Sequence, residues 1–411
     1  MIRKGVICVA ILASIWSCNK ESEQAIVYFD NPGSTAGSEP NLHVSENGTI
    51  YLSWIQAKEK EKSKLFLSKL IEHDLTWAEP KLISEGDDWF VNWADFPSIT
   101  SFGNSSLAAH YLAKSATGTY DYNVNITISN DDGNTWNTSL IPHDDKTNSE
   151  HGFVSKVALA NNEFLSVWLD GRKYAYAEKD SSIAKEMTLR CATIDNKGLL
   201  SEELELDDRV CDCCQTDTAM TQNGPIVVYR DRTAKEIRDI SYVRRVDGKW
   251  TEPKSLHSDN WSIFGCPVNG PAITTHKSKV AVAWFTAAND HAEVKVAFSE
   301  DNGASFGKPI TVNQEKPSGR VDIQFIDEES ILVSWLDNVN ENALIQLQKI
   351  QENGIKSPVI SVTETSEERS SGFPRMVVKN DQAFIAWTNS GDSLTVKTAK
   401  INTAYFPTLK N

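Results

Sequence analysis

The sequence lacks two features that would place it in common functional classes. It has no surplus of positive charge, because 41 lysines and arginines stand against 56 aspartates and glutamates, for a net charge of -15. Proteins that bind the phosphate backbone need a basic face, so we expect no nucleic-acid partner. Beyond its first residues the sequence also has no apolar run long enough to cross a bilayer. What remains is a globular composition, 40% hydrophobic and 24% charged.

The first 18 residues have the pattern of an export signal. Two basic residues, Arg3 and Lys4, precede a short apolar run that ends in Ser17 and Cys18. A small residue directly before a cysteine is typical of a bacterial lipoprotein signal peptide. We expect removal of residues 1–17, lipidation of Cys18, and a tether over 18–24. The alternative is an ordinary secretory peptide cleaved elsewhere. Both predict a location in the cell envelope, periplasmic or on the surface, with the lipid as the only membrane contact.

An aromatic residue recurs about every 55 residues through the rest of the chain. Each one ends the second of four short strands, and no stretch has a convincing helical period. The markers are Trp54, Tyr111, Trp168, Tyr229, Trp284, Trp335 and Trp387. Seven four-stranded units are typical of a seven-bladed β-propeller, and a β-solenoid is the rival fold. The last unit lacks a fourth strand, which residues 25–29 would supply to close the ring, giving one all-β domain over 25–411.

Two turns, at residues 129–136 and 299–306, share the pattern Ser-x-Asp-x-Gly-x-x-aromatic. The aspartate accepts backbone hydrogen bonds, the glycine supplies a positive φ, and the aromatic ring packs under the hairpin. This is the Asp-box, or BNR repeat, and the chain therefore resembles the sialidase superfamily and related Asp-box propellers. The resemblance implies a β-propeller with the boxes at its periphery. It also implies a glycan or other anionic ligand and glycoside hydrolase activity.

The enzymes of that superfamily imply a specific set of site residues. Three arginines hold a carboxylate, an aspartate acts as acid, and a tyrosine activated by glutamate acts as nucleophile. Their Arg-Ile-Pro motif is absent here, where residues 28–32 read Tyr-Phe-Asp-Asn-Pro, and those enzymes have six blades. Whether the chain hydrolyses a glycan, as an exo-sialidase does, or only binds one therefore stays open.

In a propeller, the loops that enter the innermost strands and leave the second strands converge on one face. In these loops the candidate acids are Asp95 and Asp217, and Tyr174 with Glu178 is the candidate tyrosine and glutamate pair. Arginines suit a bidentate grip on carboxylate, sulfate or phosphate, and the alternative is pairing with neighbouring aspartates. The candidate arginines are Arg172, Arg230, Arg320 and Arg375.

Two of the entering loops are long and rich in tryptophan, with Trp89 and Trp93 in one and Trp261 in the other. Exposed indole rings offer flat faces for stacking on a sugar. The alternative is that the rings fold down as a lid over the edges of the blades.

Cysteines are concentrated in one place. Cys211, Cys213 and Cys214 enter the fourth unit, and Cys266 enters the fifth. In an oxidising compartment one interpretation is disulfides, for instance from this cluster to Cys266. The other is a soft-metal site for copper or zinc, because thiolates prefer such ions. With a metal or scaffold role the protein would be a non-enzymatic envelope lipoprotein. We expect a monomer.

Overall fold

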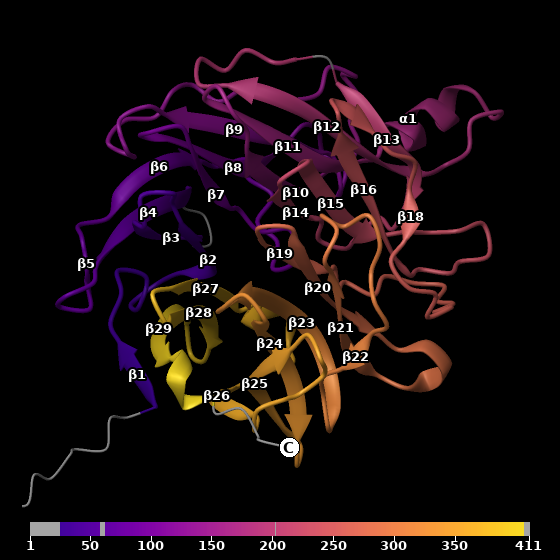
Figure 1. Ribbon diagram of the computed structural model, residues 1–411. Helices are drawn as coiled ribbons and strands as arrows, with labels where there is room; N and C mark the ends of the chain where they lie inside the picture. Colours follow the sequence, from indigo (N-terminus) through magenta and orange to yellow (C-terminus); the bar gives the residue numbers. More distant parts are fainter. Residues whose placement is uncertain (1–24, 58–61, 202, 407–411) are drawn as a thin grey trace, which may run out of the picture.

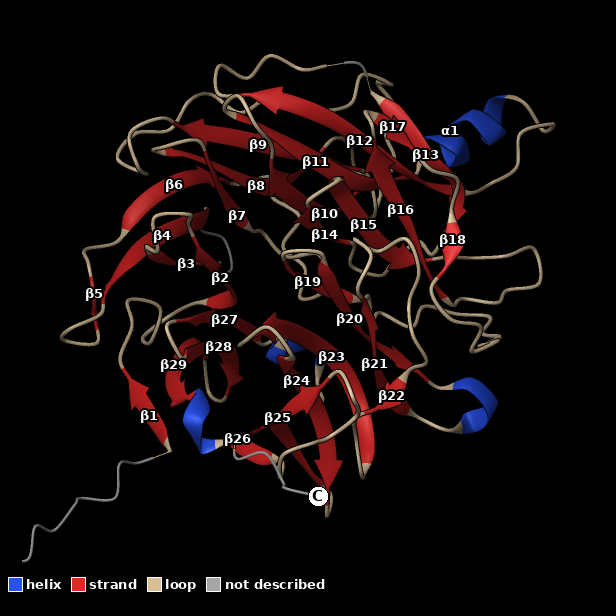
Figure 2. Ribbon diagram, in the orientation of Figure 1, coloured by secondary structure: helices blue, strands red, loops and turns tan. Residues whose placement is uncertain are grey.

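The computed structural model describes residues 25–57, 62–201 and 203–406. In that part of the chain the strands form seven antiparallel sheets arranged as a ring around a central channel (Figures 1 and 2). The predicted seven-bladed β-propeller is therefore confirmed. The predicted signal peptide, the tether and Cys18 lie outside the described residues. None of the described helices is long and apolar enough to cross a membrane.

The first three blades follow one another along the chain, each built from the channel outward. Blade 1 contains β2 (Ser38–Val44), β3 (Ile50–Gln56), β4 (Ser63–Ile71), β5 (Thr76–Trp77) and β6 (Lys81–Gly86). Blade 2 contains β7 (Ile99–Phe102), β8 (Ser106–Lys114) and β9 (Tyr122–Ser129). Its fourth strand is reduced to one antiparallel bridge, between Ile126 and Leu140. Blade 3 contains β10 (His151–Ala158), β11 (Glu163–Asp170), β12 (Met187–Asp195) and β13 (Leu204–Val210).

The next three blades repeat this order. Blade 4 contains β14 (Asp217–Thr221), β15 (Gly224–Arg230), β16 (Ile240–Val246), β17 (Lys249–Trp250) and β18 (Lys254–Ser255). Blade 5 contains β19 (Ala272–His276), β20 (Lys279–Thr286), β21 (Glu293–Ser299) and β22 (Ile310–Thr311). Blade 6 contains β23 (Lys316–Phe325), β24 (Ser330–Val339), β25 (Asn342–Gln351) and β26 (Ile360–Thr365).

Blade 7 joins the two ends of the described chain. It contains β27 (Arg375–Lys379), β28 (Gln382–Ser390), β29 (Leu394–Asn402) and, as outermost strand, β1 (Ile26–Phe29). β1 runs antiparallel to β29, with Ile26 opposite Ile401 and Phe29 opposite Thr398. The predicted closure of the ring by the N-terminal strand is thus observed.

The recurrent aromatic residues form the cores between blades. All seven are buried in the second strand of their blade, and four of the tryptophans are at most 1% exposed. Trp335 of β24, for example, shares one apolar cluster with Val294 and Val296 of the preceding blade. The aromatic period therefore reports the contacts that hold adjacent blades together.

The two turns with the Asp-box pattern make the same hydrogen bonds. In the first, the Gly133 backbone N donates to Ser129 Oγ at 2.8 Å and the Thr135 N donates to Asp131 Oδ1 at 2.8 Å. In the second, the Gly303 N donates to Ser299 Oγ at 2.9 Å. Both glycines have a positive φ. These side chains stabilise the turn itself and lie after the third strand of their blade, away from the channel.

One loop differs from the expectation of an all-β chain. Residues after β11 form the helix α1 (Arg172–Lys179) instead of an irregular loop. The helix is two turns long, too short to give a recognisable helical period, and Tyr174 packs against the core of blades 3 and 4. The other helical segments described are 3-10 turns, η1 (Ala288–Asp290), η2 (Arg369–Ser371) and η3 (Thr403–Tyr405).

Candidate functional site at the channel mouth

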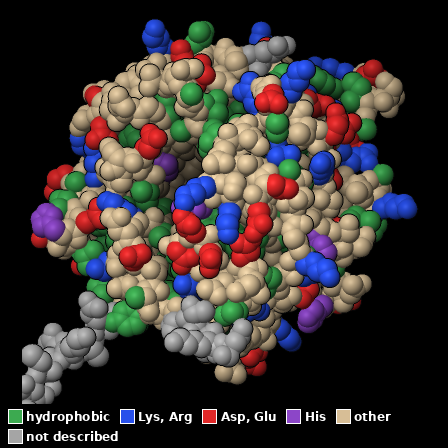
Figure 3. Space-filling model, viewed as in Figure 1, with side chains coloured by type: hydrophobic (Ala, Val, Ile, Leu, Met, Phe, Trp, Pro, Cys, Tyr) green, Lys and Arg blue, Asp and Glu red, His purple; other side chains and the backbone are tan. Residues whose placement is uncertain are grey.

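The innermost strands enclose a cavity of about 780 Å³ along the axis of the ring. The space-filling view shows a hollow near the middle of the molecule with charged side chains of both signs beside it (Figure 3). The polar and charged residues that line the cavity come from six of the blades. They include Asn41, Asp95, Lys156, Asp217, Asp322 and Arg375.

Arg375 begins the innermost strand of blade 7 and borders this cavity. Its guanidinium lies over the ring of Phe96 at 5.7 Å, and its Nε is 3.4 Å from Asp322 Oδ2. This ion-pair contact is not a hydrogen bond, and Nε is buried with no hydrogen-bond partner among the described residues. The side chain is 22% exposed. Of the four predicted arginines, this one is placed to meet a ligand in the channel.

The other three arginines have their donors engaged within the protein. Arg172 makes a bidentate pair with Asp170, with both N···O distances 2.7 Å. Arg230 donates to the backbone carbonyls of Asn269, Arg238 and Phe285. Arg172 therefore matches the alternative of pairing with an aspartate, whereas Arg230 is held by backbone carbonyls.

Arg320 is held in the same way. Its Nη1 donates to Ser371 Oγ at 2.5 Å and to the Gly372 carbonyl at 2.9 Å, and its Nη2 donates to the carbonyls of Glu367 and Glu368. The guanidinium also packs on the ring of Trp93, 5.0 Å from its centroid. Arg320 therefore ties the loop before blade 7 to blade 6.

The two predicted acids occupy a position that recurs around the ring. At this position an Asp or Asn side chain accepts a backbone N–H from the innermost strand of the next blade. The pairs are Asn41 with Ile99, Asp95 with Phe153, Asp217 with Ile273, Asn269 with Arg320, and Asp322 with Met376. Burial raises the pKa of Asp95 to about 7 and of Asp217 to about 6. Both carboxyls therefore join neighbouring blades and also exchange a proton near neutral pH.

Asp95 belongs to a group that the sequence analysis did not find. The Tyr122 hydroxyl lies 3.1 Å from Asp95 Oδ2 and 2.8 Å from Glu150 Oε1. A hydroxyl has one proton to donate, so the second contact requires a protonated carboxyl. Burial raises the pKa of Glu150 to about 8, which agrees with that requirement. Tyr122 starts β9 and Glu150 precedes β10, so only the contact between blades 2 and 3 brings them together.

The predicted pair of Tyr174 and Glu178 is arranged differently. Both lie on α1, where the Tyr174 hydroxyl donates to Asp212 Oδ2 at 3.2 Å. Glu178 is exposed, and no contact between the two residues is seen in the described chain. Burial, followed by the charge of Asp212, raises the pKa of Tyr174 to about 12, so its hydroxyl stays protonated.

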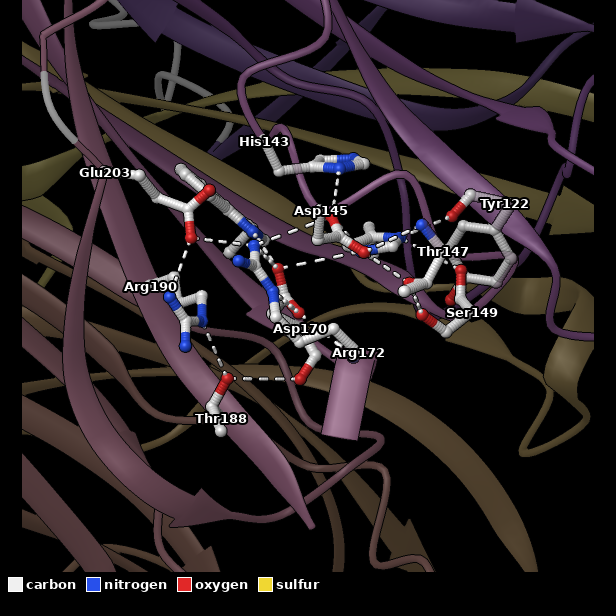
Figure 4. A network of polar contacts seen from close by, with 12 residues as sticks. Tyr122, His143, Asp145, Thr147, Ser149, Asp170, Arg172, Thr188, Arg190 and Glu203 are labelled. Carbon is white, nitrogen blue, oxygen red and sulfur yellow. Dashed lines mark hydrogen bonds and ion pairs between the residues drawn. The ribbon is translucent and has the colours of Figure 1, made fainter. Parts of the chain in front are cut away.

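A buried network of histidines and acids lies between α1 and the start of β10 (Figure 4). Asp145 Oδ1 is 2.9 Å from His143 Nδ1 and 3.2 Å from His151 Nε2. The two imidazole rings stack at 3.7 Å between centroids. The Arg172 guanidinium also forms an ion pair with Glu203, with 2.7 Å between Nη2 and Oε1. Each charge in this network faces an opposite one, so we assign it to holding α1 and the loop before β10.

Lys156 is the second cation that lines the cavity. Its Nζ lies 2.8 Å from Ser98 Oγ and 2.7 Å from His110 Nδ1. No carboxylate of the described residues forms an ion pair with it. Burial lowers the pKa of Lys156 to about 7. In the sequence, Lys156 could have been recognised as a candidate only as a charged residue within an otherwise largely apolar strand.

The predicted tryptophans lie against protein groups. Trp89 stacks on Tyr111 at 4.3 Å, Trp93 stacks on Phe373 at 5.7 Å, and Trp261 is buried under the Arg230 guanidinium at 4.9 Å. None of the three indoles is freely exposed, because Trp261 is buried and Trp89 and Trp93 are half-buried, as in the alternative of rings that fold down over the blades.

The five cysteines of the described residues are free thiols. Cys211 and Cys214 are buried, Cys213 is half-buried and Cys266 is exposed. The sulfurs of the cluster lie within 4.8 Å of one another. Burial opposes ionisation of Cys211, but its contacts with the Cys213 and Cys214 sulfurs and the charge of Arg238 hold its pKa well below its usual range.

Comparison with protein families and with curated proteins returned no match to this sequence. Solved structures do match. An ulvan lyase of polysaccharide lyase family 25, bound to an oligosaccharide of glucuronic acid and sulfated rhamnose, has a TM-score of 0.57 at 12% identity, over 91% of this chain and 96% of its own. An α-L-arabinanase of Penicillium chrysogenum, complexed with arabinobiose, has a TM-score of 0.50 at 12% identity, over 93% and 99%. The α-L-arabinofuranosidase of Fusarium graminearum has 0.50 at 14%, over 93% and 99%. These likenesses show the fold.

Proposed function

We propose that this chain binds an acidic glycan at the mouth of its central channel and hydrolyses it there. The observation that carries the proposal is the position of Arg375. Arg375 borders a cavity of about 780 Å³, and its two Nη atoms donate no hydrogen bond within the described residues, whereas the other predicted arginines use theirs. A guanidinium in such a position is suited to a carboxylate or sulfate group of a sugar.

Two further observations support an acidic ligand, one in the cavity and one from structures of similar fold. Lys156 lines it without an ion-pair partner in the described residues. The solved structures of similar fold include enzymes that act on glycans, one of them bound to a uronic-acid oligosaccharide. This is an argument from fold, which hosts many functions, so the residues of the site must decide the activity.

The roles follow from the charges. Arg375 would hold the anionic group of the sugar. Asp217, whose pKa lies at about 6 because of burial, would donate a proton to the leaving oxygen, and Asp95 is the alternative donor. A carboxyl that is still partly protonated near neutral pH is the requirement for this step.

The test is a panel of sialosides, uronic-acid glycans, sulfated glycans and neutral glycans, assayed for binding and for new reducing ends. We expect Arg375→Ala to lower kcat/KM on the acidic members by about 10- to 100-fold, the value of a charge-assisted hydrogen-bonded pair. The control is Arg245→Ala on β16, outside the channel lining. Asp217→Asn should lower kcat with little change in binding.

Three results would count against the proposal. Absence of binding to every glycan by folded protein would reject it. Equal activity of the Arg375→Ala and Arg245→Ala variants would reject the site. Binding without product would reject hydrolysis and leave a binding protein.

Export and lipid attachment at Cys18 form a separate part of the proposal. The support is the sequence pattern of residues 1–18. Labelling of cells with a fatty-acid analogue should mark the wild-type protein and not the Cys18→Ser variant. Equal labelling of both would refute lipidation at this residue.

A further inference from the structure

We propose that Cys211, Cys213 and Cys214 bind one Cu(I) ion through their three sulfurs. The thiols belong to the loop that enters blade 4, beside the channel mouth, and the proposed glycan site does not use them. Any of the three sulfurs that still carries a proton releases it to solvent as it binds the ion. The inference is independent of the proposed function.

The distances between the sulfurs fit a shared metal ion. Cys211 Sγ lies 3.4 Å from Cys214 Sγ and 3.9 Å from Cys213 Sγ, and all three are within 4.8 Å of one another. Sulfurs bound to one ion at about 2.3 Å lie about 3.8 to 4.0 Å apart, for tetrahedral and trigonal arrangements respectively. The loop therefore presents three sulfurs at nearly the separation that coordination needs, with only small side-chain movements.

The same distances do not describe a disulfide. Sulfurs joined by a disulfide are about 2.05 Å apart, well below the closest pair in this cluster. A shared ion engages all three sulfurs.

The surroundings of the cluster suit a group with excess negative charge. The Arg238 guanidinium, 4% exposed, donates from Nη1 to Cys211 Sγ at 3.2 Å. Three thiolates and one Cu(I) carry a net charge of about -2, which this cation would reduce. The Cys211 backbone N–H is fixed by the Arg230 carbonyl at 3.0 Å, and Arg238 is itself held by Glu236 at 2.9 Å. Groups that orient a ligand in this way are typical of metal sites.

The number of sulfurs favours copper over zinc. Soft thiolates select Cu(I) and zinc among common ions, and structural zinc takes four protein ligands. The sulfurs that lie within 4.8 Å of one another are those of Cys211, Cys213 and Cys214, and the exposed Cys266 lies beside Cys213 but outside this group. Cys213 is half-buried, which gives an ion access from the surface.

The first experiment is an anaerobic titration of the reduced full-length chain with Cu(I) against a chromophoric Cu(I) chelator. We expect one tightly bound Cu(I) per chain and at least about 100-fold weaker binding by Cys213→Ser. The matched control is Cys191→Ser, which removes another buried thiol, on β12. Equal affinity of these two variants would overturn the proposal, as would preference for Zn(II) over Cu(I) in direct competition.

A second experiment needs no variant. Wild-type protein is alkylated with iodoacetamide with and without one equivalent of Cu(I), and modification is located by mass spectrometry. Copper should protect Cys211, Cys213 and Cys214 and leave the exposed Cys266 reactive. Protection of Cys266 alone, or of none, would refute the site, and a disulfide between Cys211 and Cys214 that persists under these reducing conditions would refute it as well.

Discussion

Replacement of Asp95 by asparagine should change how the stability of the protein depends on pH. Asp95 is 3% exposed, and burial raises its pKa from 3.8 to about 7. Because the folded protein then binds this proton more tightly than the unfolded chain does, ionisation of Asp95 costs stability as the pH rises from about 4 to 7. A shift of about 3 units corresponds to about 4 kcal/mol. An asparagine keeps an oxygen for the Phe153 N–H and cannot ionise.

The assay is urea unfolding of the wild type and of Asp95→Asn at several values between pH 4 and pH 8. The free energy of unfolding of the wild type should fall relative to that of the variant by up to about 4 kcal/mol across this range. Because the charge of Asp95 also raises the pKa of Glu150, the difference reports Asp95 together with its coupling to Glu150. Asp392→Asn, at an exposed carboxyl, serves as control. Parallel pH curves for wild type and Asp95→Asn would show that Asp95 is ionised throughout and that the argument from burial is wrong.

Two further predictions concern stability. Gly303→Ala and Gly354→Ala both place a Cβ on a residue of positive φ, which should cost about 1 kcal/mol each. Only at Gly303 would that Cβ lie 2.6 Å from Ile226 Cδ1, so its unfolding free energy should fall by about a further 1 to 3 kcal/mol in urea, and equal losses would contradict the packing. Arg320→Lys should lower the free energy of unfolding by about 2 to 3 kcal/mol, because a lysine ammonium cannot reach the four acceptors that the Arg320 guanidinium contacts. Thermal melts against the exposed Arg369→Lys would check this, and a shift no larger than that control's would count against it.

The fold could be predicted because its signal is distributed through the whole chain. Each blade needs an aromatic residue to fill the space against its neighbour, so Trp54, Trp168 and Trp335 recur at the interval of one blade. The same regularity predicted that residues 25–29 would complete blade 7. Helix α1 was missed because two helical turns do not establish a period.

The candidate site could be predicted in residue type but not in contacts. Loop position indicated arginines as candidates, and of the four only Arg375 lines the cavity. Whether a guanidinium is free depends on carbonyls from other blades, such as those of Asn269 and Phe285 around Arg230, and nothing local to Arg230 specifies them. For the same reason, the contact of Tyr122 with Asp95 and Glu150 has no sequence signature.

β1 and β29 pair with each other, although one is synthesised early and the other late. β1 leaves the ribosome as the first of the described strands, yet its partner is the last of them. Until then β1 has no sheet to join, and an unpaired strand can associate with other chains. The ring can thus close only after β29 has been made, which makes the final blade the step at which folding and aggregation compete.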